Sequence, residues 1–424
     1  MSQSNISRLP KSSNKLSAIT LAIVTSALLS ACGEDTSAEA GPDFGGGNTQ
    51  PPTQTEFNEQ ALIANLADNV ITPTFQQFQQ DAQAQASLVD AYCQAETAFE
   101  QLTVSEQAVA DARLAAQNGW GTAMATWQQA ELMQLGPLLE NDSLLKNSIY
   151  SWPIVNSCAV DFDVVFFAEG TVNGQPYDIT RRTPSRKGMA ALEYLLFNEE
   201  LADSCPTGSP DNWNNQTETY RKLARCNFAV EVANDIVNSS GELLNLWTGD
   251  NGYAQQLKTA GSAVSNIASE HDAVNRLSDA MFYLDTTTKD GKLATPLGLF
   301  ANSCGSQACP EDVESGFANQ SIEHVVNNLR GFEQLLTGKE GIGFTDYLID
   351  VGDQATADSL TADVQAAIAD AEAYQTSLAD TLTSNEAQVA ETHGKVKAIT
   401  DTLKADFINS LALELPQTSA GDND

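Results

Sequence analysis

The sequence predicts an all-α protein built as two up-and-down helical bundle domains. Apolar residues recur three and four positions apart along most of the chain, and the alternation typical of strands is rare. Pro73 predicts a kink in the first helix, because proline lacks the backbone donor. Asn173-Gly174 predicts a turn or small hairpin within residues 170–184. Helices are expected over residues 57–98, 105–133, 154–168, 185–197, 214–247, 252–269, 271–287, 321–337, 353–381 and 384–412.

A division into two domains is expected because residues 57–424 are too many for one compact core of usual size. A polar, glycine-rich break at residues 248–252 interrupts the helical pattern and marks the boundary. We therefore expect three parts after the N-terminal region: an N-terminal bundle, a C-terminal bundle and a disordered tail, over residues 57–250, 251–415 and 416–424.

The first 31 residues have the pattern of a lipoprotein signal peptide. Three basic residues precede an apolar stretch at residues 16–29 that is too short to span a bilayer comfortably. Cys32 follows Leu29-Ser30-Ala31, so it is expected to be the lipid-modified first residue of the mature chain. The alternative is an ordinary secretory signal followed by an incidental cysteine.

Residues 32–56 combine glycine and proline with polar side chains and predict a flexible tether. A lipid on Cys32 would attach the chain to a membrane through this tether. Gly33 follows the cysteine in place of the aspartate that signals inner-membrane retention. We therefore expect a location in a Gram-negative cell envelope, on the periplasmic side of the outer membrane.

The formal net charge of the chain is −35 at pH 7. A surface this acidic disfavours nucleic acid and anionic membrane surfaces as partners. It is compatible with the capture of cations, but solubility or a saline habitat explains it equally well. The charge therefore argues against nucleic acid and anionic membranes as partners, but it does not indicate which partner the protein has.

The six cysteines after Cys32 are an even number, which in an exported chain suggests disulfides. Fifteen connectivities are possible for six cysteines. No pair has the C-x-x-C spacing of a zinc site. Closeness in sequence and the expected order of helices favour the pairs Cys304–Cys309, Cys205–Cys226 and Cys93–Cys158.

Residues 185–197 carry the most functional information. Ser185 is expected to cap a helix in which Glu193 is the only acid of an otherwise apolar run. Side chains three apart share a helix face, and metal sites on helices often use a carboxylate and a histidine at that separation. Ala190 stands three residues before Glu193, so only the carboxylate of such a pair is present.

This segment resembles the G-x-H-x-x-E motif of the imelysin-like family of bacterial envelope proteins. Gly188 and Glu193 match the motif, and Ala190 replaces its histidine. The resemblance extends over about residues 57–412. Further matching residues are Trp120, Trp127, Gln128, Glu131, Gly136, Pro137, Ile149-Tyr150-Ser151-Trp152-Pro153, Phe282-Tyr283-Leu284-Asp285, Lys289-Asp290-Gly291-Lys292-Leu293, Pro296-Leu297-Gly298 and Glu314-Ser315.

The resemblance implies two helical bundles related by duplication, with a cleft between them near the motif. It also implies a part in iron uptake, so the leading hypothesis is a protein that binds iron, or a ligand carrying it, together with an outer-membrane receptor or another uptake component. One alternative is a metallopeptidase of the imelysin type, but zinc peptidases need several ligands and Ala190 removes the motif's histidine. Another is a receptor-docking protein without a metal site.

A metal in this cleft would be held mainly by oxygen ligands, which favours iron or another hard cation over zinc. Glu193 would lie at its centre, with Glu96, Glu131 and Glu314 as candidate ligands from other helices. The alternative for Glu193 is a structural ion pair with a nearby base: Arg181, Arg182, Arg186 or Lys187.

Other residues are expected to line the cleft through the same resemblance. Lys289 and Lys292 would pair there with Glu193 or Glu314, or bind an anionic ligand; the alternative is a turn whose lysines contact helix carbonyls. No metal role is expected for the histidines, which lack a second ligand at metal spacing: His271, His324 and His393. The remaining cleft residues are expected to be Trp152, Arg186, Gly188 and Ser315.

Overall fold

Helices make up almost all the regular structure of residues 57–210 and 212–419, the part of the chain that the computed structural model describes. The predicted all-α class is confirmed. The expected signal peptide (1–31), Cys32 and the tether (32–56) lie outside the described residues. Within the described residues, no helix combines the length and apolar character needed to cross a bilayer.

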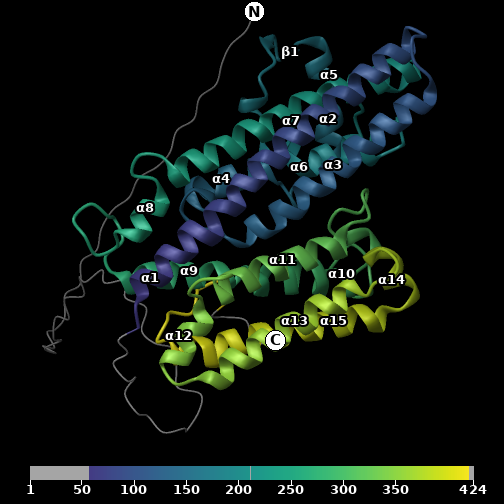
Figure 1. Ribbon diagram of the computed structural model, residues 1–424. Coiled ribbons are helices and arrows are strands. Elements are labelled where there is room, and N and C mark those ends of the chain that lie inside the picture. The colour runs from purple at the N-terminus through teal and green to yellow at the C-terminus, as the bar shows by residue number, and fades with distance from the viewer. Residues whose placement is uncertain (1–56, 211, 420–424) are drawn as a thin grey trace, which may run out of the picture. The chain divides into compact units, whose positions relative to one another are not determined.

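The helix with the imelysin-like motif packs against neighbouring helices of the first half (Figure 1). Helix α1 continues into α2 through a π-helical turn, Leu66–Ile71. Pro73 lies in the first turn of α2, directly after this change of helical pitch. The helices are α1 (Glu59–Asn65), α2 (Thr72–Glu100), α3 (Glu106–Leu132), α4 (Glu140–Ile149), α5 (Ser157–Glu169), α6 (Gly188–Phe197) and α7 (Glu218–Thr248).

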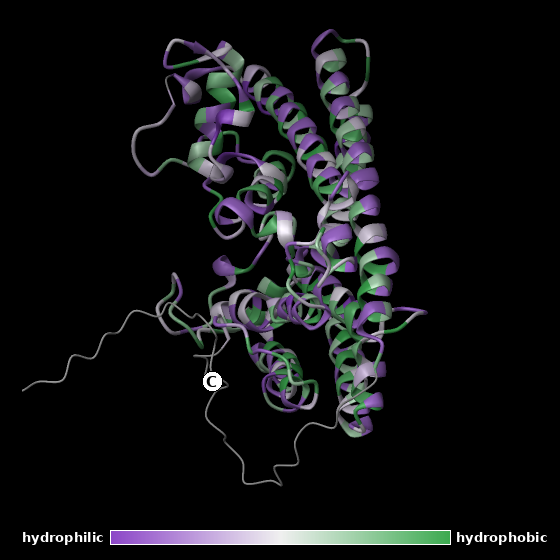
Figure 2. Cartoon of the chain, turned by 90° about the vertical axis from the view of Figure 1, so that its left-hand side faces the viewer, coloured by the Kyte–Doolittle hydropathy of each residue, from purple (hydrophilic) through white to green (hydrophobic). Residues whose placement is uncertain are grey.

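Large aromatic side chains hold the three longest of these helices together. Helix α2 packs against both α3 and α7. Phe78 of α2 contacts Trp127 of α3 at a ring-centroid distance of 4.9 Å, and Phe75 contacts Trp247 of α7 at 5.3 Å. All four side chains are buried. Hydrophilic and hydrophobic residues alternate along the long helices (Figure 2), as expected when one side of each faces the core.

The second half contains shorter helices and a long π-helical segment. That segment, η6 (Leu284–Ala294), carries both lysines expected in the cleft. The other helices are α8 (Tyr253–Lys258), α9 (Glu270–Met281), α10 (Thr295–Leu297), α11 (Ser321–Thr337), α12 (Phe344–Asp350), α13 (Gln354–Glu372), α14 (Leu378–Ser384), α15 (Glu386–Thr402), the π-helical η8 (Leu403–Phe407) and α16 (Ile408–Ser410).

Short elements connect the helices. Two strands form the predicted hairpin around Asn173, with Thr171 paired to Pro176 and Val172 to Gln175. The strands are β1 (Thr171–Val172) and β2 (Gln175–Pro176), and the 3₁₀ turns are η2 (Gly136–Leu138), η3 (Ile179–Arg181), η4 (Pro184–Arg186), η5 (Trp213–Asn215) and η7 (Pro310–Asp312).

The helix boundaries agree with the sequence in some places and differ in others. The helix expected over 105–133 is α3, which Ser105 caps, and the helix expected at 321–337 has the expected bounds. The predicted cap Ser185 is wrong, because it lies in the 3₁₀ turn η4 and the motif helix begins at Gly188. The helix expected over 353–381 is interrupted between α13 and α14.

Two of the three predicted disulfides are wrong. The structure pairs Cys93 with Cys226 and Cys158 with Cys205, and confirms only Cys304–Cys309. The predicted pairs Cys93–Cys158 and Cys205–Cys226 are wrong because the packing of the helices, and not closeness in sequence, decides which cysteines meet. Helices α2 and α7 lie side by side, which brings the Cα atoms of their cysteines to 5.3 Å.

Helix α11 of the second half packs against α3 of the first (Figure 1). Gly331 permits this close approach, because a Cβ atom there would lie 2.9 Å from the Gln129 carbonyl oxygen. Gln129 also donates to the Asn327 side chain at 2.9 Å and accepts from Gln334 at 2.9 Å. The contact joins half-buried polar groups of the two helices. The domain boundary near residue 250 and the duplication stay predictions.

The end of the described chain is a turn. Ser419 is buried, and its amide donates to the Pro416 carbonyl at 2.9 Å. Residues 420–424, the remainder of the expected tail, lie outside the described residues.

Candidate functional site

The glycine of the motif sets where helix α6 begins. Gly188 has φ +79°, and a Cβ atom there would lie 2.7 Å from the Ile149 carbonyl oxygen at the end of α4. Glycine is therefore the residue that both the backbone conformation and the close approach require. The first nine residues of α6 are buried as a result of this packing.

Ala190 and Glu193 face a pocket of about 730 Å³, which we call the motif pocket. Its walls combine aromatic and apolar side chains with a few polar groups, as is usual for small-molecule sites. The lining residues are Tyr150, Trp152, Pro153, Val155, Ser157, Ala190, Glu193, Tyr194, Gly291, Thr295, Pro310, Glu311, Asp312, Val313, Ser315, Gly316 and Phe317.

Glu193 is a buried carboxyl group, with 4% of its surface exposed. Its Oε1 accepts a hydrogen bond from the Ala318 amide at 2.9 Å. Burial raises the pKa of Glu193 to about 7, although the Ala318 amide and His324 favour the ionised form. The group therefore changes charge near neutral pH.

Behind the pocket, Glu314 is held by four side chains from separate elements. Its Oε1 accepts from Tyr150 at 2.6 Å and from Gln128 at 3.1 Å, and lies 3.1 Å from Lys292 Nζ. Its Oε2 lies 3.2 Å from His324 Nδ1. Burial alone would raise the pKa of Glu314, but Lys292, His324 and Tyr150 outweigh it and lower the pKa to about 2.

Lys292 supplies the positive charge of this region. Its ammonium group donates to Gln128 Oε1, and its Nζ lies 3.7 Å from Glu131 Oε2. It also lies over the rings of Trp152 and Tyr283, at 5.8 and 5.6 Å from their centroids. Burial raises the pKa of Glu131, and the charge of Glu314 adds to this while Lys292 opposes it.

Asn328 connects this cluster to the helices. Its side-chain amide donates to the Gln128 carbonyl at 2.8 Å and to Gln128 Oε1 at 2.9 Å, and its Oδ1 accepts from Thr288 at 3.1 Å. Elements α3, η6 and α11 thus meet at one set of buried groups, which we call the polar centre. It consists of Gln128, Glu131, Tyr150, Lys292, Glu314, His324 and Asn328.

A second buried network positions one wall of the motif pocket. Tyr194 donates its hydroxyl to Asp161 at 2.9 Å, and Arg225 lies 3.2 Å from the same carboxylate. The amide of Ser204 donates to Asp161 at 2.8 Å. The Tyr194 ring is therefore held against Phe317, with 5.3 Å between ring centroids.

Comparison with known proteins identifies the family. The family model described as imelysin matches residues 71–405, which is most of the chain. The chain belongs to the imelysin family. The search of curated proteins finds no match.

Two solved structures share the imelysin fold with this chain. An imelysin-like protein from Psychrobacter arcticum 273-4 aligns with a TM-score of 0.62 and 16% identity, over 85% of this chain and 99% of that one. A protein named as an iron-regulated protein A precursor, from Parabacteroides distasonis ATCC 8503, aligns with a TM-score of 0.60 and 16% identity, over 82% and 95%.

The residues present in this imelysin do not fit a metal ion. Among the described residues, no group of three or more histidine, cysteine, aspartate or glutamate side chains is placed to hold one. Lys292 already places a cation between Glu131 and Glu314. Ala190 contributes no ligand beside Glu193. The histidine of the family motif is therefore missing, and two of the other candidate ligands, Glu131 and Glu314, are already paired with the chain's own lysine.

The candidate residues from the sequence separate into two sets. Glu131, Lys292 and Glu314 belong to the polar centre, and Glu193, Trp152 and Ser315 line the motif pocket. Glu96 lies elsewhere on α2, where it accepts from Tyr92 at 3.0 Å. Lys289 is buried against Asp285 at 3.0 Å and does not line the pocket.

The bases near Glu193 in sequence have other partners. Arg182 and Arg186 lie 2.7 and 3.4 Å from Asp163, and Lys187 lies 3.0 Å from Asp235. Arg181 is exposed. Arg186 therefore stabilises helix α5 and is absent from the walls of the motif pocket.

His324 is the main functional residue that sequence reasoning missed. It has no local metal-binding spacing, yet α11 places it beside Glu314 and near Glu193. Gln128 and Tyr150 matched the family pattern, but nothing in their spacing indicated that they bond to Glu314. These groups meet because α3, the segment after α4, η6 and α11 pack around Glu314.

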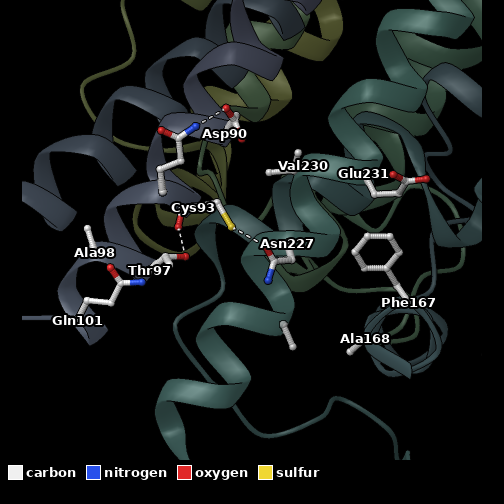
Figure 3. A pocket seen from close by; sticks show the side chains of 12 residues that line it. Asp90, Cys93, Thr97, Ala98, Gln101, Phe167, Ala168, Asn227, Val230 and Glu231 are labelled. Atoms are coloured by element: carbon white, nitrogen blue, oxygen red, sulfur yellow. Dashed lines mark hydrogen bonds between the residues drawn. The ribbon is translucent and has the colours of Figure 1, made fainter. Parts of the chain in front are cut away.

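A second pocket, of about 600 Å³, lies between α2, α5 and α7 (Figure 3). Asp90 and Cys93 from α2, Phe167 from α5 and Glu231 from α7 are among its lining residues. Burial raises the pKa of Glu231, and Asp235 adds to this. The two pockets share no lining residue, so this one is separate from the motif pocket.

Proposed function

We propose that this imelysin is a binding protein for iron uptake that takes an organic ligand carrying iron, and not the bare ion, into the motif pocket. The observation that supports this most directly is the polar centre, in which Lys292 satisfies the carboxylates that a metal would need. The pocket in front of it has the size and mixed lining of a small-molecule site.

The link to iron comes from the family and from one structural relative. That relative, from Parabacteroides distasonis, is named as an iron-regulated protein A precursor. Its identity to this chain is 16%, so the shared fold supports the proposal without assigning a ligand.

A metallopeptidase is a weaker proposal for this chain. A catalytic zinc ion takes three protein ligands and keeps one position open for water. Among the described residues, no group of three or more histidine, cysteine, aspartate or glutamate side chains is placed to hold a metal around Glu193. The geometry therefore favours binding over peptide hydrolysis.

Filling the motif pocket should abolish uptake. Ala190 lines the pocket, so Ala190→Phe places a ring beside Glu193 without altering the ion pairs of Lys292. The test uses iron-limited cells that lack the chromosomal copy of the gene. The wild-type chain should restore their uptake of radioactive iron. With Ala190→Phe the uptake should be at least about tenfold lower, the change expected from losing 1.4 kcal/mol or more of ligand binding.

The matched control is Ala168→Phe, which adds the same ring to the second pocket. It should restore uptake fully. Equal uptake with Ala190→Phe and the wild-type chain would contradict the proposal, as would normal uptake in cells without the protein.

We also propose that the protein works in the cell envelope, anchored through Cys32. Cys32→Ser should remove labelling by radioactive palmitate and move the protein from the membrane fraction to the soluble fraction, because the acylated thiol is lost. Ser37→Ala, in the same segment, should change neither. A labelled Cys32→Ser protein would show that the anchor lies elsewhere. An outer-membrane receptor or another uptake component is the expected partner.

A further inference from the structure

The motif pocket carries charge of one sign. Its described walls contain three carboxyl groups, Glu193, Glu311 and Asp312, and no lysine, arginine or histidine side chain. Lys292 Nζ lies over the ring of Trp152, 5.8 Å from its centroid, but Lys292 is not one of the lining residues. An anionic ligand would therefore enter an acidic pocket without a positive partner there, which disfavours it.

Aromatic faces line the same pocket. Trp152, Tyr194 and Phe317 are among its walls, and the Tyr194 and Phe317 rings meet edge to face. Trp152 already has an ammonium group near its ring, that of Lys292. Aromatic rings attract cations through their electron-rich faces, and tryptophan does so most strongly.

Two buried polar groups in the pocket have bonding capacity to spare. Within the described residues, Glu193 forms no ion pair within 4 Å, and its Oε1 accepts a hydrogen bond from the Ala318 amide, while His324 and the Ser315 hydroxyl also favour its ionised form. Ser315 lies beside it, 5% exposed, and its hydroxyl forms no hydrogen bond of ordinary geometry. Burial outweighs these groups and disfavours the charge of Glu193, and a bound cation would reduce that penalty.

We infer that the motif pocket binds an organic cation, with its ammonium group held by Glu193 and Ser315 and its apolar part against Trp152, Tyr194 and Phe317. This inference rests on the proposed function only in taking this pocket as the binding site. It assigns a chemical class to the ligand, whether or not that ligand carries iron: an amine with an apolar body.

Binding of such a cation should become tighter as the pH rises through 7. The pKa of Glu193 is about 7, and the ammonium group favours its ionised form. Glu314 stays ionised across this range because its pKa is about 2, and it is paired with Lys292 and His324. Tyr150 stays neutral, since burial raises its pKa well above the ordinary value.

The size of the pH effect follows from the ionised fraction of Glu193. For a pKa of about 7, this fraction rises about tenfold between pH 6 and pH 8, and the apparent affinity rises by the same factor. Below pH 7, each binding event should release a proton from Glu193.

Isothermal titration calorimetry with phenethylammonium tests the inference on the full chain in detergent. 2-Phenylethanol and 3-phenylpropionate serve as the neutral and anionic analogues of the same size. We expect saturable binding of phenethylammonium, about tenfold tighter at pH 8 than at pH 6, and no saturation with 3-phenylpropionate. At pH 6, the measured binding enthalpy should depend on the ionisation enthalpy of the buffer, because binding releases a proton that the buffer takes up.

Two variants locate the binding. Glu193→Gln should weaken phenethylammonium binding at pH 8 by at least about tenfold, the cost of losing 1.4 kcal/mol, and remove its pH dependence. Glu96→Gln, the same change outside the pocket, should leave the binding unchanged. Unfolding curves for both variants verify that they are folded.

The outcomes separate this inference from the proposed function. Tighter binding of the neutral or anionic analogue, or equal binding by Glu193→Gln and the wild-type chain, overturns the organic-cation assignment. If Ala190→Phe still abolishes iron uptake in that case, the binding role stands with a ligand of another class. If Ala190→Phe supports normal uptake while phenethylammonium binds as expected, the iron role falls and the cation site stands.

Discussion

Replacing Lys292 by methionine is expected to lower the free energy of unfolding by about 3–5 kcal/mol. Lys292 is 1% exposed and lies 3.1 Å from Glu314 and 3.7 Å from Glu131. Without it, the Glu314 carboxylate remains buried and loses the charge that lowers its pKa most. Urea denaturation at pH 7, followed by circular dichroism, measures the change.

A second substitution distinguishes loss of charge balance from loss of packing. The double variant Lys292→Met with Glu314→Gln should recover most of the lost stability, because no uncompensated charge remains at that position. Lys222→Met is the surface control, since Lys222 pairs with Glu218 at the exposed start of α7 and should change stability little. A loss below about 1 kcal/mol for Lys292→Met, the size of a surface ion pair, would contradict this account of the polar centre.

Glu193→Gln is expected to stabilise the protein at pH 8.5 by up to ~3 kcal/mol and to have little effect at pH 4. Burial raises the pKa of Glu193 from 4.5 to about 7 in the folded state. The folded protein therefore holds a proton that the unfolded chain releases between these two pH values. Stability is lost as the pH rises through this range, and glutamine removes the loss because it does not ionise.

Urea midpoints of Glu193→Gln and the wild-type chain, measured from pH 4 to pH 8.5, test this prediction. Glu218→Gln is a control of opposite sign, because Lys222 lowers the pKa of Glu218 and its carboxylate favours the folded state at high pH. A stability difference for Glu193→Gln that does not change with pH would show that the pKa of Glu193 is the same in the folded and unfolded states, and would contradict the prediction.

The local pattern of the sequence predicts the long helices. Helix α3 has its serine cap at Ser105, and apolar spacing predicts the bounds of α11. Gly188 and Glu193 belong to a helix that lines a pocket, as their motif suggests. These features depend on neighbours within a few residues, which sequence spacing records.

Contacts between distant segments are where sequence reasoning is insufficient. Glu314 collects partners from α3, the segment after α4, η6 and α11, and no spacing rule relates these positions. Cys93 pairs with Cys226 for the same reason, since the packing of α2 on α7 decides it. The π-helical pitch of η6, which places Lys292, also has no clear signal in its residues.

The position of Lys292 has a consequence for how the protein matures. Proteins that place a metal among buried carboxylates reach their stable fold only when that metal is supplied, and chelators unfold them. Here the balancing cation is a side chain, so the interior is complete as soon as the chain folds. Its stability should not depend on how much metal the cell contains, which suits a protein whose proposed task arises when iron is scarce.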